Sequence, residues 1–548
     1  MNRLPISVPT TAATLCAAAL VTTSALAQQG VQINTDANGR DKTGDAGNEP
    51  SIAVSPTNPL QIVIGWREFP TVNSDARKAG FGYSHDGGLT WTNGGYLDPP
   101  PGWSQSTQQT DPVLGADSSG TFFYWSEPFR PDAAQWIYPS TDGGVTWGTP
   151  SAAQSPTNGD KDWMAIDTTG GVGDGHIYGG WNHFNLGGQC FVRSTDGGNS
   201  FSTPVRIADA GGTQWMMHFA VDPDGDVYAA WRNMSRNAIY ITKSTNAKNA
   251  GTTPTFDAFG SGGYNGLDIK IDSGNDPDFL GINPVGFHQI YLGIDHSNGP
   301  RRGWVYCLWA DKRRDGSDIY FARSNDGGFT WVTGIRVNDD PSGTYQWMPA
   351  MSVAPNGRID ACWYDTRNHS GTYPNSEMFY SFSLDGGDHW SVGRRISDSF
   401  STRIGWPSQQ KIGDYIDSRS DSDSMMIAYA ATFTGGQDVY FMRVEPTLLT
   451  VDNLVAGQNA HIAVTGAVPN KPVWVAASTS GTGSTYVSQL TVYLGLDQPF
   501  QVDKQVKADA NGNASWDVFV PNAGKGQQVW FQAVQSENGS NMVSGVIQ

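Results

Sequence analysis

The sequence predicts an all-β protein: a β-propeller, with seven blades favoured and six possible, followed by a small Ig-like β-sandwich. Three observations carry this prediction. A phrase of the form S-x-D-G-G-x-[T/S/H]-[W/F] occurs five times, an apolar strand ending in an aromatic residue recurs seven times, and roughly the last 100 residues lack both patterns. Repeats of this spacing each form one supersecondary unit, and neighbouring units bury their faces on one another.

The repeated phrase predicts a tight hairpin turn. Its aspartate can accept hydrogen bonds from backbone N–H groups further round the turn, and its two glycines supply positive φ angles without steric cost. A single D-G-G is ordinary turn chemistry, but five copies with the same flanking serine and aromatic residue indicate a repeated structural unit. The copies are Ser84–Trp91, Ser140–Trp147, Ser194–Phe201, Ser324–Trp331 and Ser383–Trp390.

The aromatic-ended strands give the blade count. Seven lies within the usual range of roughly four to eight blades. The fourth repeat has Ser244-Thr245-Asn246 where the phrase should begin, and Val31 to Asn34 could supply an outer strand that closes the last blade. The seven strands are Ile62–Trp66, Phe122–Trp125, Ile177–Trp181, Val227–Trp231, Val305–Trp309, Ile359–Trp363 and Met426–Tyr429.

Three segments follow from these patterns. Residues 1–27 read as a secretory signal peptide that ends in Ala25-Leu26-Ala27, so the mature chain is expected outside the cytoplasm, in the medium or the periplasm. Residues 28–446 form the propeller. Residues 447–548 alternate as short antiparallel strands of a sandwich, and both a glycan-binding role and a passive spacer role remain open for it.

Charge, hydropathy and cysteine content exclude some classes of function. The net charge of −18 argues against a nucleic-acid partner, and no stretch after the leader approaches the run of about 18 apolar residues that a membrane span needs. Cys190, Cys307 and Cys362 are an odd number in the mature chain, so we expect buried apolar cysteines and no disulfide framework. A monomer without a cofactor is expected.

Charged residues gather where one rim of the propeller is expected. The repeated phrase marks the turn between the third and fourth strand of a blade, so residues that follow each aromatic-ended strand lie on the opposite rim. These charges could form a binding site or could be solvated loop charges that pair with one another. The candidates are Arg67, Glu68, Glu127, Arg232, Asp311, Arg313, Arg314, Asp365 and Arg367, and the connections into the next blade add Asp111, Asp160, Asp162, Gln214, His218, Gln346 and Asp414.

The five phrases are Asp boxes, and the chain resembles the secreted sialidase-like β-propellers. The resemblance implies an exoglycosidase that binds a sugar carboxylate with three arginines and uses a tyrosine nucleophile, a neighbouring glutamate and an aspartate as acid/base. By position, Asp75 resembles the acid/base aspartate and Tyr415, in Gly413-Asp414-Tyr415, the nucleophile. Asp224 to Asn233 is similar to the segment with the second arginine, Arg232; Arg313 or Arg314 matches the third, with Arg367 as a rival.

The chain departs from that family at two places. Asn48-Glu49-Pro50 stands where the first arginine is expected, and Gln214 to His218 lacks the glutamate. A non-catalytic propeller that binds glycan or protein is therefore one alternative, and a lyase on uronic-acid polymers with His183 or His218 as base is another. Two aspartate-rich stretches, 222–226 and 417–423, resemble calcium loops without their complete spacing, which favours turn chemistry over structural calcium.

Overall fold

The computed structural model describes residues 30–100, 102–128, 135–154, 159–207, 214–233, 238–256, 269–270, 289–314, 316–340, 343–371 and 374–548. The predicted leader, residues 1–27, lies outside these ranges. The chain divides into two compact units: residues 28–388 with 396–445, and residues 446–548 with the short segment 389–395. Among the described residues no helix is long and apolar enough to cross a membrane.

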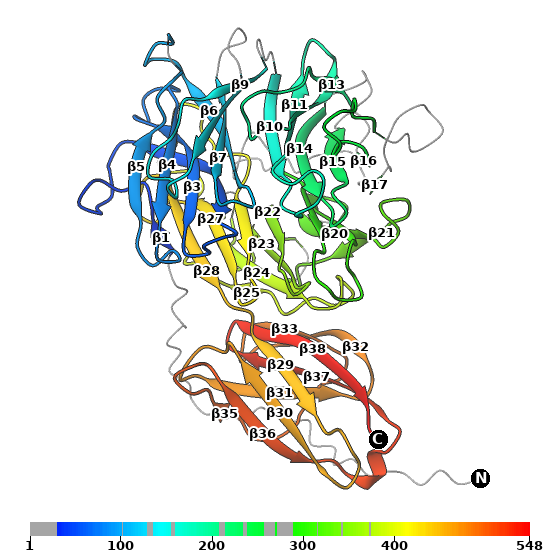
Figure 1. The fold of residues 1–548 in the computed structure, drawn as a ribbon. Helices are drawn as coiled ribbons and strands as arrows, with labels where there is room; N and C mark the ends of the chain where they lie inside the picture. The colour runs from blue at the N-terminus through cyan, green and yellow to red at the C-terminus, as the bar shows by residue number, and fades with distance from the viewer. Residues whose placement is uncertain are drawn as a thin grey trace. The chain divides into compact units, whose positions relative to one another are not determined.

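The first unit is a seven-bladed β-propeller. Seven four-stranded antiparallel sheets form its blades, with β25 (Arg394–Arg395) of the sixth blade supplied by the segment 389–395 (Figure 1). The first strand of each sheet contacts the first strand of the next sheet, and the seventh returns to the first, so the ring is closed. The prediction of seven blades is confirmed.

The first four blades run in chain order from the inner to the outer strand. They are β2 (Ala46–Val54), β3 (Ile62–Phe69), β4 (Lys78–Ser84) and β5 (Thr92–Tyr96); β6 (Gln109–Ala116), β7 (Phe122–Pro128), β8 (Gln135–Ser140) and β9 (Ser151–Gln154); β10 (Gly159–Ile166), β11 (Ile177–His183), β12 (Gly188–Ser194) and β13 (Val205–Arg206); and β14 (Gln214–Val221), β15 (Val227–Asn233), β16 (Ala238–Ser244) and β17 (Ile269–Lys270).

The last three blades follow the same order, except that the final outer strand comes from the start of the described chain. Val31 pairs with Phe441 there, which confirms the predicted closing strand. The strands are β18 (Tyr291–Ile294), β19 (Val305–Asp311), β20 (Asp318–Ser324) and β21 (Val332–Arg336); β22 (Gln346–Val353), β23 (Ile359–Asp365), β24 (Glu377–Ser383) and β25 (Arg394–Arg395); and β26 (Asp417–Ser420), β27 (Met425–Ala431), β28 (Asp438–Val444) and β1 (Val31–Gln32).

Each Asp box joins the third strand of a blade to the outer one. In the first box, the Ser84 hydroxyl accepts the Gly88 amide at 2.9 Å and Asp86 accepts the Thr90 amide at 2.9 Å. Gly88 has φ +90°, and a Cβ on it would lie 2.2 Å from the Phe441 ring of the neighbouring blade. The box therefore fixes both the turn and the packing between blades.

The aromatic residues at the strand ends build the interior of the propeller. Trp66, Trp125, Trp181, Trp309 and Trp363 are all at most 1% exposed. Such side chains bury large apolar areas and supply much of the hydrophobic stabilisation.

The second unit is a β-sandwich. Apolar residues of two sheets face one core, among them Ile462 and Trp516 from one sheet and Val475 and Phe531 from the other. One sheet has β29 (Leu448–Asp452), β30 (Asn459–Thr465) and β36 (Ala514–Phe519); the other has β34 (Phe500–Gln501), β31 (Pro472–Ser478), β37 (Gln528–Gln535), β38 (Asn538–Val546) and β35 (Val506–Lys507). A hairpin of β32 (Thr482–Val487) and β33 (Val492–Leu496) and a 3₁₀ turn, η1 (Asn522–Gly524), complete it.

Candidate functional site

A bulge recurs at one position of the inner strands. In five blades the register with the second strand shifts by one residue near the start of the inner strand. A non-glycine residue with φ between 45° and 63° lies inside each shift. This left-handed conformation costs about 1–2 kcal/mol per residue, and a bulge re-aims a side chain. The five residues are Glu49, Asp111, Lys161, Met216 and Met348.

Three of these re-aimed side chains meet, although they come from three different blades. Lys161 Nζ lies 3.4 Å from Asp111 Oδ2, and the charges of Asp111 and Lys161 both act on the Glu49 carboxyl. Because inner strands of different blades come together only around the propeller axis, this group lies at the axis. It lies at the end of the strands away from the Asp boxes: Arg67, beside Glu49, is near the end of β3, whereas the box serine Ser84 pairs with Ile62 at its start. We call this end the mouth.

A buried chain of ion pairs connects the meeting point to the seventh blade. Lys161 Nζ lies 2.6 Å from Asp414 Oδ2, and Lys411 Nζ lies 2.6 Å from the same oxygen. Lys411 Nζ is also 3.4 Å from Glu49 Oε1, which lies 2.8 Å from an Arg67 nitrogen. We call the six residues the axial ion network: Glu49, Arg67, Asp111, Lys161, Lys411 and Asp414.

The environment of the network shifts the pKa values of its carboxyl groups in opposite directions. For Asp111 and Asp414, burial opposes ionisation, but the charges of Lys161, Lys411 and Arg67 together outweigh it and hold both pKa values well below their ordinary range. For Glu49, burial dominates over the charge of Arg67 and raises the pKa to about 7. Burial likewise lowers the pKa of Lys411, even with Asp414 beside it.

A second group of carboxyls adjoins the network. One oxygen from each of Asp111, Glu127 and Asp160 can be chosen so that all three lie within 4.8 Å of one another. Asp162 adjoins them, because the charge of Asp111 acts on its carboxyl group and its own charge raises the pKa of Glu127. We call Asp111, Glu127, Asp160 and Asp162 the mouth carboxylates.

The mouth carboxylates differ in their access to solvent. The Asp160 side chain is 38% exposed, whereas Glu127 and Asp162 are 5% and 4% exposed. Burial raises the pKa of Asp160 to about 6 and those of Glu127 and Asp162 well above the ordinary range, and neighbouring carboxylates add to each shift. Such a group can hold a shared proton or a cation.

Tyr415 packs beneath the mouth. It is 3% exposed, its hydroxyl donates to the Pro112 carbonyl at 2.9 Å, and the Trp163 ring meets it edge-on with centroids 5.5 Å apart. Burial raises its pKa well above the ordinary value. In this geometry the hydroxyl is engaged with backbone and is not presented to solvent.

Asp75 lies on the same rim, in the loop between β3 and β4, and is exposed. The residue two positions on, Arg77, is 6% exposed and packs its guanidinium 5.8 Å from the Phe69 ring centroid, while the Arg67 guanidinium lies 5.2 Å from the same ring. Burial and then the charge of Arg67 lower the pKa of Arg77. The two guanidinium groups lie below the surface at this edge, since Arg67 is 1% exposed and bound to Glu49, and the charge of the exposed Asp75 acts on Arg77.

Three other predicted site residues hold the indole groups of their own blades. Trp66 donates its indole N–H to Glu68 at 2.5 Å, Trp309 donates to Asp311 at 2.8 Å, and Trp363 donates to Asp365 at 2.9 Å. The spacing W-x-[D/E] is the sequence signal for this contact, and it indicates that these carboxylates brace the end of the second strand.

Arg313 and Arg367 are bound to those bracing carboxylates. Arg313 lies 2.5 Å from Asp311 and 4.1 Å from the centroid of the Tyr320 ring, and Arg367 lies 2.7 Å from Asp365. The other two predicted arginines differ in exposure: Arg232 is 4% exposed at the end of β15, and Arg314 is exposed.

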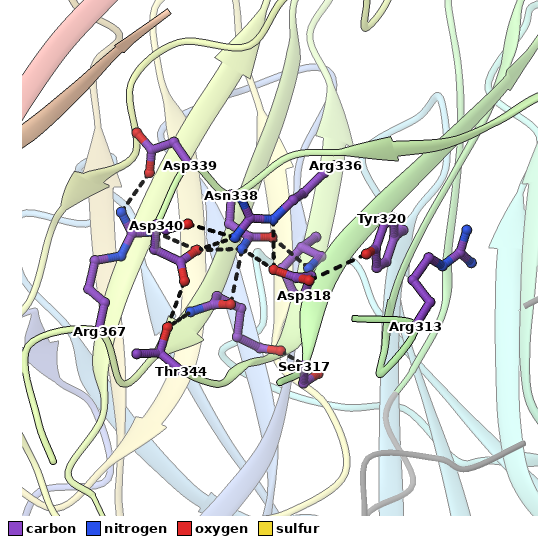
Figure 2. Close-up of polar contacts among 12 residues, drawn as sticks. Arg313, Ser317, Asp318, Tyr320, Arg336, Asn338, Asp339, Asp340, Thr344 and Arg367 are labelled. Atoms are coloured by element: carbon purple, nitrogen blue, oxygen red, sulfur yellow. Dashed lines mark hydrogen bonds and ion pairs between the residues drawn. The ribbon is translucent and has the colours of Figure 1, made fainter. Parts of the chain in front are cut away.

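Arg367 also enters a polar network between the fifth and sixth blades (Figure 2). It lies 2.6 Å from Asp339, and the adjacent Asp340 accepts hydrogen bonds from Asn338 at 2.5 Å and Thr344 at 2.6 Å. Burial raises the pKa of Asp340 despite Arg367. This network holds Asn338, Asp340 and Thr344 together between β21 and β22.

The structure therefore brings Arg67, Tyr415 and five predicted rim carboxylates together near the axis. The carboxylates are Asp111, Glu127, Asp160, Asp162 and Asp414. Glu68, Asp75, Asp311, Asp365 and the other predicted arginines stay in their own blades or loops. Sequence reasoning did not single out Glu49, Lys161 or Lys411 as a group. A signal for the bulge was present, since the re-aimed residue precedes a proline in three inner strands. These prolines are Pro50, Pro112 and Pro349.

The chain matches no protein-family model, and no curated protein matches it. Its fold is similar to that of a Hadza microbial sialidase, with 13% identity over 76% of this chain and 68% of that one and a TM-score of 0.39. An intramolecular trans-sialidase from Ruminococcus gnavus is 12% identical over 58% of this chain and 89% of its own, with a TM-score of 0.40. An α-L-arabinofuranosidase from Fusarium graminearum is 15% identical over 76% of this chain and 98% of its own, with a TM-score of 0.37. This likeness concerns the fold alone.

Proposed function

We propose that the protein is a glycan-active glycosidase that removes a terminal acidic sugar at the mouth of the propeller. The observation that carries the proposal is the exposed Asp75 beside two buried guanidinium groups, those of Arg77, 6% exposed, and Arg67, 1% exposed and bound to Glu49. Paired guanidiniums suit a carboxylate, because their N–H groups meet its two oxygens in a fixed geometry. An aspartate beside the bound sugar can supply the acid/base step. The resemblance to sialidase-like propellers supports the same substrate class.

The charge state of the network favours an anion below neutral pH. Glu49 lies 2.8 Å from Arg67, and its pKa is about 7. At lower pH the Glu49 carboxyl takes up a proton, so the positive charge of Arg67 is no longer countered by this partner. An acidic sugar is therefore expected to bind better at pH 5.5 than at pH 8.

Tyr415 is the residue on which the sialidase-type version of the proposal depends. To act as nucleophile, its hydroxyl would have to leave the Pro112 carbonyl and lose a proton that burial makes harder to remove. Tyr415→Phe deletes only the hydroxyl. A nucleophile would lose at least about 10³-fold in kcat, whereas a packing hydroxyl would cost about 1 kcal/mol of stability with little change in rate.

The decisive experiment compares fluorogenic substrates on the chain from Gln28 onward. A 4-methylumbelliferyl sialoside and glucuronide test acidic sugars, and the α-L-arabinofuranoside serves as the neutral comparison. We expect release from an acidic substrate, a loss of about 10²–10⁴-fold in Asp75→Asn, and a fall of about 10–100-fold in kcat/KM in Arg77→Met, from the lost charged hydrogen bond. Arg314→Met, an exposed arginine of another blade, is the control.

Two outcomes would overturn the proposal. Release from the neutral furanoside alone would remove the arginine pair from substrate recognition, and unchanged rates in Asp75→Asn would remove that residue from catalysis. A binding propeller is the second candidate, favoured by the enclosed Tyr415 hydroxyl. It predicts no release from any substrate together with saturable binding of an acidic oligosaccharide in calorimetry.

A further inference from the structure

We propose that three of the mouth carboxylates, Asp111, Glu127 and Asp160, bind one divalent cation of the calcium type. This inference goes beyond the glycosidase proposal, because cation binding can be measured without any substrate or turnover.

The first argument is distance. Oxygens of the three residues lie within 4.8 Å of one another. Calcium binds oxygen ligands at about 2.3–2.6 Å, so two ligands on opposite sides of one ion are separated by up to about 5 Å. A single calcium ion therefore fits between these three carboxyl groups without moving the strands that carry them.

The second argument is independent of the cluster's acidity. Asp162 is 4% exposed, and neither of its carboxyl oxygens has a hydrogen-bond donor among the described residues; the same is true of Glu127 Oε2. Buried polar groups are normally satisfied, and an unpaired buried carboxylate is strongly unfavourable. A cation between these residues supplies the missing counter-charge.

The charges around the site also favour a bound cation. Six carboxyl groups of the mouth carboxylates and the axial ion network face four cationic side chains, Arg67, Arg77, Lys161 and Lys411. Lys161 is directed to Asp414 at 2.6 Å and stays 4.0 Å from Asp160. With all six groups ionised, two negative charges remain uncompensated, which a divalent ion would balance.

The donor set selects the type of ion. It consists of carboxylate oxygens, which suit hard cations such as calcium and magnesium rather than zinc or copper. Calcium is favoured over magnesium because magnesium demands near-ideal octahedral geometry, whereas three carboxylates from separate blades form an irregular site. The 38% exposure of the Asp160 side chain leaves the outer coordination positions to water or to sugar oxygens.

The test uses the chain from Gln28 onward after treatment with a chelator. Calcium titration by calorimetry and terbium luminescence, excited through tryptophan, are measured on the wild type, Glu127→Gln, Asp160→Asn and the control Asp75→Asn. We expect one high-affinity site per chain, at least a tenfold loss of affinity in the two ligand variants, and no change in the control. Calcium is also expected to raise the melting temperature of the wild type.

Several results would overturn the inference. They are an absence of calcium binding in the wild type, equal affinity in all four proteins, and binding that persists in Glu127→Gln and Asp160→Asn, which would assign the ion to another acidic loop. Circular dichroism establishes that the variants are folded. Asp160→Asn keeps the inference testable even if the buried Glu127→Gln does not fold, because the Asp160 side chain is partly exposed.

Discussion

Lys161→Met tests whether the axial ion network is the structural centre of the mouth. The substitution keeps a long side chain but removes a charge that lies 2.6 Å from Asp414 and 3.4 Å from Asp111. Asp414 keeps Lys411 at 2.6 Å, whereas Asp111, 3% exposed, loses its ion pair. Removing one partner of a buried pair costs about 3–5 kcal/mol. With an unfolding entropy of about 2.1 cal/mol/K per residue over roughly 400 residues, the melting temperature should fall by about 4–6 °C.

The assay is thermal unfolding at pH 7.5 and pH 4.5 with chelator present. In the wild type, Lys161 holds the pKa of Asp111 below its ordinary value, so this contribution to stability is present above about pH 4 and is lost as pH falls. In the variant the buried Asp111 keeps its proton to higher pH, so the penalty appears above about pH 4 and grows towards neutrality. The loss should therefore be smaller at pH 4.5.

The double variant Lys161→Met/Asp111→Asn completes the cycle. Because it removes both charges, it should be more stable than Lys161→Met alone, with a coupling of about 1–3 kcal/mol. A drop of less than 1 °C in Lys161→Met, an equal drop at both pH values, or a double variant with no recovery would refute the view that Asp111 depends on Lys161.

Three further predictions follow from burial and backbone geometry. Gly387 has φ +90°, and a Cβ on it would lie 2.2 Å from Phe321, whereas Gly95 has φ +88° and open space around it. In denaturant titrations, Gly387→Ala should lower the free energy of unfolding by about 2–4 kcal/mol and Gly95→Ala by about 1 kcal/mol. Equal losses would contradict the packing argument. Burial raises the pKa of Glu49 to about 7 and that of Asp160 to about 6. The folded state therefore keeps protons that the unfolded chain has lost, so the melting temperature should decrease from pH 5 to pH 7.5. An increase would contradict these pKa shifts. Cys190, Cys307 and Cys362 are each 0% exposed. A thiol reagent should therefore label no cysteine in the native mature chain and three after denaturation. Rapid labelling of the native chain would contradict their burial.

The sequence predicts the propeller well because the signals are local. An Asp box forms within eight residues, and an aromatic-ended strand identifies the second strand of a blade without reference to its neighbours. The axial ion network has no such signal, since Glu49 and Asp414 are 365 residues apart and meet only when the ring closes. The bulges that aim Glu49, Asp111 and Lys161 at one another depend on the pairing of strands, which composition does not reveal.

The second blade shows how register decides the role of a residue. Glu127 has the same W-x-[D/E] spacing as the bracing residues Glu68 and Asp311. The pairing of Val113 with Trp125, however, corresponds to that of Ser51 with Gly65, which places Trp125 one position earlier than Trp66 in its blade. A shift of one residue turns a side chain to the other face of a sheet.

The consequence of that shift is chemical. The Trp125 indole donates to Gln135 at 2.8 Å rather than to Glu127, and Glu127 takes the place that Arg67 has in the first blade. An acid that would otherwise brace an indole is thereby directed to Asp111 and Asp160. The same motif thus makes a brace in three blades and a ligand-type carboxylate in the second.

The bulge position also distributes polarity around the axis. It carries Glu49, Asp111 and Lys161 in the first three blades, but Met216 and Met348 in the fourth and sixth. The two buried methionines offer neither charge nor hydrogen bonds, so among these five bulges only those of the first three blades supply charged side chains. Because the strained backbone is retained on both sides, the geometry belongs to the propeller, and the residue type at this position determines where the chemistry occurs.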